Sequence, residues 1–132
     1  MTDFLAERLN LVNETYFNLS SLPLIKWSKG KIKKKYRRIT FGCYDIKKNE
    51  IRIHPVFKTA AFPSFVLDFV IFHEMLHYID RDTLKQKRKL AFCEKRKIHD
   101  KVFKIKESKF PYSDRARKIL RCFAEGKKSD YF

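Results

Sequence analysis

The order of apolar and polar positions along the first part of the chain predicts a helix followed by a strand. Residues 3–19 carry apolar side chains at nearly helical spacing, which predicts an amphipathic helix with Thr2 as its N-terminal cap. Pro23 ends the turn that follows this helix. Residues 24–28 are short and apolar enough to form a strand.

Two further β-rich segments follow, at residues 37–44 and 50–54. Residues 45–49 between them are turn-forming, so the two segments are expected to pair as an antiparallel hairpin. In the second segment, Ile51 and Ile53 alternate with polar residues. One face of this strand is therefore expected to be buried and the other to be polar.

The rest of the chain is mainly helical in pattern. Helices are predicted at residues 63–80, at 83–106 and at 114–124, the last with Ser113 as its cap. The chain is expected to form one domain, residues 1–132. Its predicted fold is α+β: a small, three-stranded, mostly antiparallel sheet packed with an N-terminal helix, the helix at 63–80, a third helix and a C-terminal helix.

The helix at 63–80 contains the sequence His-Glu-Met-Leu-His at positions 73–77. Residues four apart lie on one face of a helix, so His73 and His77 can bind one metal ion with Glu74 beside it. A chance occurrence of this pattern is expected in only about one of 170 chains of this composition. The surrounding residues are apolar, and buried polar side chains need partners. The pattern therefore predicts a zinc site in which Glu74 is the general base.

A catalytic zinc ion needs a third protein ligand, and two residues downstream are candidates. His99 is preferred, because it lies outside the motif and is followed one helical turn later by Phe103, which can anchor the helix beneath the metal. Glu94 is the alternative. The two positions differ by about 140° around a helix, so they are not expected to bind the same ion together.

The chain is strongly basic, with a net charge of +16 and a pI of about 9.9. Between Lys26 and Arg38, eight basic residues occur without an acidic one, and residues 85–106 form a second basic stretch. Two interpretations are open: the solvated face of a helix, or contact with nucleic acid.

No uncharged apolar run is long enough to span a membrane, and the N-terminus has no signal-peptide pattern. A cytoplasmic protein is therefore expected. Cys43, Cys93 and Cys122 have no paired spacing and are interpreted as buried, small apolar residues.

Four segments, taken in order, resemble those of the SprT-like zinc metallopeptidases and of the small archaeal minigluzincins, which mimic the catalytic domains of membrane-bound gluzincin peptidases. They are residues 40–44, 51–55, 73–77 and 99–103. The SprT-like pattern has a histidine ligand followed four residues later by an aromatic residue, as at His99 and Phe103. The gluzincin pattern has a glutamate, which implies Glu94. Position 100 is Asp where the SprT-like pattern usually has Gly.

The resemblance implies a zinc-dependent endopeptidase. Zinc on His73, His77 and His99 would polarise a water molecule, and Glu74 would take its proton and pass it to the leaving amine. The implied substrate is a polypeptide.

The resemblance also implies features around the zinc. Residues 49–54 would form an edge strand to which an extended substrate adds. Tyr44, His54 and Tyr112 are alternative donors to the oxyanion. Residues 127–132 or the N-terminal helix would cover the cleft of a latent zymogen.

The charge and the motif are also compatible with three other functions. A SprT-like peptidase acting on DNA-bound proteins would use the basic charge. A non-catalytic nucleic-acid-binding module with structural zinc is less favoured, because such sites normally have four protein ligands and Glu74 would have no role. A degenerate peptidase is disfavoured by the intact motif.

Overall fold

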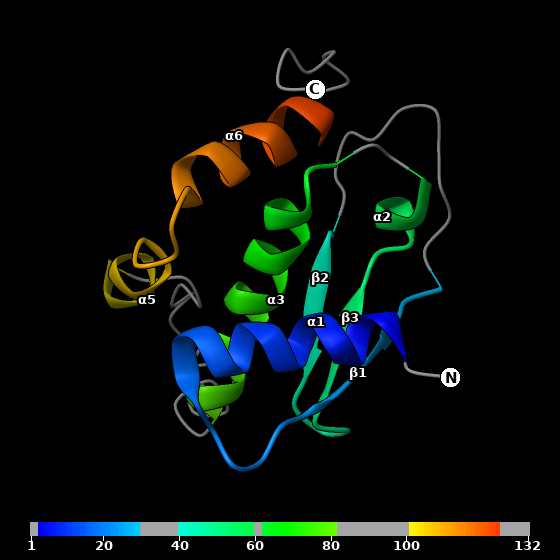
Figure 1. Cartoon of the computed structure of the whole chain (residues 1–132), viewed down its shortest axis with the longest axis vertical. Helices are drawn as coiled ribbons and strands as arrows, with labels where there is room; N and C mark the ends of the chain where they lie inside the picture. The colour runs from blue at the N-terminus through cyan, green and yellow to red at the C-terminus, as the bar shows by residue number, and fades with distance from the viewer. Residues whose placement is uncertain (1–2, 30–39, 60–61, 82–100, 125–132) are drawn as a thin grey trace, which may run out of the picture.

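A three-stranded sheet and a long helix, α3 (Ser64–Ile79), organise the protein (Figure 1). The computed structural model describes residues 3–29, 40–59, 62–81 and 101–124. The fold is α+β, as the sequence predicts.

The N-terminal helix consists of α1 (Phe4–Val12) and a short π-helical continuation, η1 (Asn13–Phe17). Its N-terminal cap is Asp3, whose side chain accepts a hydrogen bond of 3.0 Å from the backbone N–H of Leu5. The prediction of a helix here is confirmed, but the cap lies one residue after the predicted Thr2.

The sheet contains β1 (Leu24–Trp27), β2 (Gly42–Asp45) and β3 (Glu50–Ile53) in the order β1-β3-β2. Strands β2 and β3 are antiparallel, which confirms the hairpin, and β1 is parallel to β3. Residues 37–39 of the predicted hairpin lie outside the described part of the chain.

Strand β3 is the central strand of this sheet, with β1 on one side and β2 on the other. Both of its backbone edges therefore take part in pairing. The expectation that residues 49–54 form a substrate-binding edge is wrong. The alternation of side chains within β3 shows which residues face the core, but it does not show which strands pair with β3. The parallel pairing with β1 could therefore not be predicted from it.

The two faces of the sheet differ as predicted. Ile51 and Ile53 are fully buried on the inner face. On the outer face, Arg52 donates to Glu50 and to Asp45, each over 2.8 Å. This charged network covers the face of the sheet that is turned away from the core.

Two of the described helices that follow β3 pack against α3. Short helix α2 (Val56–Thr59), which the sequence did not predict, leads toward it, while α5 (Lys101–Glu107) and α6 (Ser113–Ala124) pack against it. In Figure 1, α5 lies on the side of α3 opposite the sheet, and α6 lies near the N-terminal end of α3.

These positions confirm the helices predicted at 63–80 and 114–124. Of the helix predicted at 83–106, residues 83–100 lie outside the described ranges. Every helix within the described ranges is too short or too polar to span a lipid bilayer.

The core joins α1, the inner face of the sheet, α3 and α6. Its fully enclosed side chains come from each of these elements, and burial of apolar area on this scale is the main stabilising term in folding. They include Leu5, Ile51, Ile53, Ile71, Met75 and Ile119.

Candidate metal centre

Helix α3 carries three polar side chains into a mostly apolar interior. Glu74 and His77 are only 4% and 8% exposed, and the His73 side chain is 21% exposed. Val70 and Met75 beside them are almost completely buried. Polar groups in such a setting are costly unless they are bonded or bind an ion.

The three side chains converge as the motif predicts. One ligand atom from each of His73, Glu74 and His77 lies within 4.8 Å of the others. His73 Nε2 is 3.9 Å from Glu74 Oε2, so this ring nitrogen faces the general-base candidate. Imidazole nitrogens with a nearby carboxylate are a donor set that suits zinc.

Phe103 on α5 packs against both histidines. Its ring stacks on His77 with a centroid distance of 4.5 Å and an interplanar angle of 19°, and it meets His73 edge-on at 4.9 Å. The side chain is 5% exposed. Phe103 therefore restricts the orientation of both rings.

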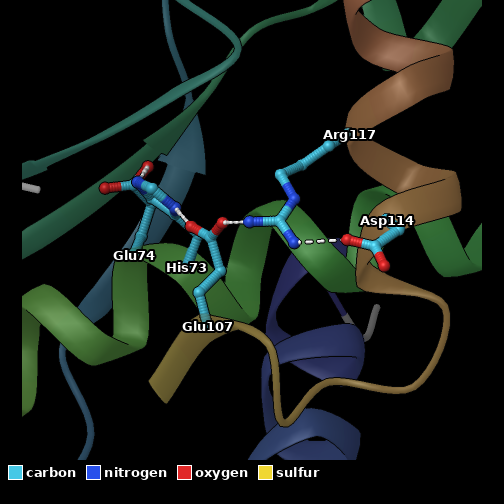
Figure 2. Close-up of polar contacts among 5 residues, drawn as sticks. All are labelled: His73, Glu74, Glu107, Asp114 and Arg117. Atoms are coloured by element: carbon cyan, nitrogen blue, oxygen red, sulfur yellow. Dashed lines mark hydrogen bonds and ion pairs between the residues drawn. The ribbon is translucent and has the colours of Figure 1, made fainter. Parts of the chain in front are cut away.

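Glu107, one turn after Phe103, is a site residue that the sequence analysis missed. One carboxylate oxygen contacts His73 Nδ1, and the other accepts a hydrogen bond of 2.7 Å from Arg117 on α6 (Figure 2). Glu107 is 6% exposed. Two signals pointed to it: it is an isolated acid in a lysine-rich segment, and it lies four residues after Phe103.

The burial of this cluster changes its acid–base properties. Burial raises the pKa of Glu74 to about 7, although the charge of His73 opposes the shift. For His73, burial acts to lower the pKa, but the hydrogen bond to Glu107 and the charges of Glu74 and Glu107 outweigh it and raise the pKa. A carboxyl group with a pKa near neutrality is well suited to general-base catalysis.

Strand β2 lies directly against this part of α3 at Gly42. A Cβ atom added at Gly42 would be 2.7 Å from Val70 Cγ1 and 3.3 Å from Glu74 Oε2. Glycine is therefore required for the close approach of the strand to the helix. This approach makes β2 the wall of the site beside Glu74.

We expect Gly42→Ala to lower the free energy of unfolding by about 1–3 kcal/mol, because the added methyl group overpacks a buried contact. Denaturant unfolding measures this loss. Val70→Ala in the same chain removes the clashing Cγ1 atom, so the double variant should recover part of the stability. A Gly42→Ala protein as stable as the unmodified chain would contradict the contact.

Two predicted ligands, His99 and Glu94, lie outside the described residues.

The three predicted oxyanion donors, Tyr44, His54 and Tyr112, lie within the described residues. Tyr44 donates its hydroxyl to Asn49 Oδ1 over 2.6 Å, and Nδ1 of the buried His54 accepts from the Val56 N–H over 2.9 Å. Burial lowers the pKa of His54, which favours the neutral ring. Tyr112 is 66% exposed.

The three-stranded sheet and the helices packed against it form the fold of a known metallopeptidase. A solved structure with this fold is the metallopeptidase zymogen abylysin of Pyrococcus abyssi. The TM-score is 0.60 at 11% sequence identity, and the match covers 95% of this chain and 98% of that chain. No protein-family model matches the chain, and no curated protein matches its sequence.

Proposed function

We propose that the chain is a zinc-dependent endopeptidase. The observation that carries this proposal is the convergence of His73, Glu74 and His77 on a buried face of α3. The shared fold with a metallopeptidase zymogen supports it. A structural zinc site would leave the buried carboxyl group of Glu74 without a function.

The proposed zinc ligands are His73, His77 and His99. Support for His99 comes from spacing: it precedes Phe103 by four residues, the same interval that separates Phe103 from Glu107. Phe103 and Glu107 both contact histidines of the motif. Glu94 is the alternative third ligand.

The proposed mechanism is hydrolysis of a peptide bond by a water molecule. When bound, zinc lowers the pKa of this water and polarises the substrate carbonyl. Glu74 accepts the proton of the attacking water and passes it to the nitrogen of the leaving amine. Burial raises the pKa of Glu74 in the metal-free site, and its carboxyl group lies 3.9 Å from His73 Nε2, in reach of the position proposed for the water.

We place the substrate on β2, because this strand lies at the edge of the described sheet and Gly42 brings it next to Glu74. An extended peptide can add to such an edge through backbone hydrogen bonds. This assignment replaces residues 49–54, which lie largely in the central strand.

For latency, residues 127–132 are the better of the two proposed segments. Helix α1 contributes the buried Leu5 and Leu9 to the core, so its displacement would expose apolar area as well as the site. Residues 127–132 lie outside the described part of the chain. The zymogen state of abylysin supports latency as a property of this fold.

The net charge of +16 supports substrates that are bound to nucleic acid, as in the SprT-like interpretation. Cleavage of a DNA-binding protein would then be faster with DNA present, and the gain would disappear at high salt because phosphate contacts are screened. An unchanged rate with DNA would remove this part of the proposal.

Cleavage of casein, measured with and without the chelator 1,10-phenanthroline, tests the main proposal. We expect the chelator to abolish cleavage and stoichiometric zinc to restore it. The assay should use both the full chain and a chain that ends at Gly126, so that latency does not hide the activity. Chelator-resistant cleavage, or no cleavage by either zinc-loaded chain, would contradict the proposal.

A further inference from the structure

The polar contacts of His73 continue from α3 through α5 to α6. Glu107 connects His73 to Arg117, and Arg117 also donates over 2.7 Å to Asp114 (Figure 2). The proposed chemistry uses neither Glu107 nor Arg117. We propose that these two are positioning residues that fix the ring of His73, so that the docking of α6 on the core controls metal affinity. This inference rests on the proposed metal site.

The contact of Glu107 selects one tautomer of His73. An ionised carboxylate only accepts hydrogen bonds, so Nδ1 must carry the proton and donate it to Glu107. The lone pair is then on Nε2, the nitrogen that lies 3.9 Å from Glu74 Oε2. The contact therefore directs the metal-binding nitrogen of His73 toward Glu74 and His77.

Glu107 contacts Nδ1 of His73, and not Nε2, the ring nitrogen that faces Glu74. Its two oxygens are occupied by different partners, His73 Nδ1 and Arg117 Nη1. Nδ1 and Nε2 point in different directions from the imidazole ring. A carboxylate bonded to Nδ1 can therefore orient His73 while Nε2 stays available to bind the metal. Such outer contacts orient metal-binding histidines and raise their basicity.

Arg117 makes the buried position of Glu107 tolerable. The Glu107 side chain is 7% exposed, and a carboxylate at this depth is costly without an opposite charge. The Arg117 side chain is 32% exposed and reaches Glu107 from α6. Asp114 accepts a hydrogen bond from the other guanidinium nitrogen of Arg117, but its side chain is 98% exposed. An ion pair in contact with solvent contributes little to stability.

The coupling between α6 and the metal site follows from this geometry. If Arg117 is removed, Glu107 loses the cation that α6 supplies, and its hold on His73 weakens. The loss should appear as weaker zinc binding rather than as general unfolding, because α6 is also held by the buried Ala116 and Ile119.

Arg8 provides a matched control. It pairs with Asp68, which lies on α3 like His73, and Arg8 Nε is 2.8 Å from Asp68 Oδ1. The exposed fractions of the Arg8 and Asp68 side chains are similar to that of the Arg117 side chain. Arg8→Gln removes an arginine–carboxylate pair from α3 without touching His73. Asp114→Asn removes the exposed end of the network alone.

The experiment measures the zinc dissociation constant of the full chain by competition with a chelator, together with unfolding of the metal-free protein. We expect Glu107→Gln to weaken zinc binding by about 10–100-fold and Arg117→Gln by about 10-fold, the range found for outer-shell partners. Arg117→Lys should recover part of the loss. The double variant Glu107→Gln/Arg117→Gln should bind zinc no more weakly than Glu107→Gln alone, because Arg117 acts on the metal site only through Glu107.

Arg8→Gln and Asp114→Asn are expected to leave the zinc dissociation constant within about twofold of the unmodified chain, since neither side chain touches Glu107 or His73. Unchanged affinity in Arg117→Gln, or an equal loss in Arg8→Gln, would overturn the inference while the metal site itself stands. Failure of the unmodified chain to bind zinc would instead overturn the proposed function, and the inference with it.

Discussion

Replacing Glu74 by Gln is expected to abolish most of the peptidase activity while zinc remains bound. The change is nearly isosteric, and it removes the negative charge and the ability to accept a proton from water. General acid–base catalysis typically contributes about 10²–10⁴-fold to a rate, so hydrolysis should fall by about that factor. Single-turnover cleavage of a peptide by the zinc-loaded variant measures the loss.

A suitable control is Glu50→Gln. Glu50 is also buried, at 7% exposure, but it accepts from Arg52 on the outer face of the sheet. Loss of that ion pair should change stability and leave turnover of the folded protein unaltered. Equal activity of Glu74→Gln and the unmodified chain would exclude Glu74 as the base.

The second large effect concerns the third zinc ligand. His99→Ala is expected to weaken zinc binding by more than about 100-fold, beyond the effect of outer-shell changes, and to abolish hydrolysis. Glu94→Ala should retain both properties. A chelator competition assay on the two variants, side by side, gives the ratio of their dissociation constants.

If only Glu94→Ala loses zinc, the third ligand is the glutamate of the gluzincin pattern and the prediction of His99 is wrong.

His54→Ala is a matched control for the removal of an imidazole. His54 is buried and bonded to Val56, so its loss should lower stability without changing zinc affinity in the folded protein.

The sequence predicted the parts of the site that depend on local spacing. His73, Glu74 and His77 lie within five residues on one helix, so helical geometry alone brings them together. Phe103 was also predicted, although its contact with His77 spans 26 residues, because its helical spacing from His99 suggested a position beneath the metal.

Glu107 shows the limit of this reasoning. It lies 34 residues from His73, and its partner Arg117 lies on another helix. Its isolation among lysines and its spacing from Phe103 mark it as a candidate, but neither signal identifies its partners. Its function depends on how α5 and α6 pack on α3, which is a property of the tertiary structure.

The sheet shows a similar division. Alternation within residues 50–54 predicted correctly which side chains face the core, since the two faces of a strand follow from a period of two. The neighbours of the strand do not follow from that period. The parallel pairing of β1 with β3 makes residues 50–53 a central strand, and we therefore propose β2 as the substrate edge instead.

Anomalous diffraction at the zinc absorption edge from crystals of the zinc-loaded chain tests the central claim most directly. We expect one peak about 2.0–2.1 Å from Nε2 of His73 and from a ring nitrogen of His77, with Glu107 on the far side of the His73 ring. Absence of a peak between these histidines in zinc-loaded crystals would contradict a zinc site on α3.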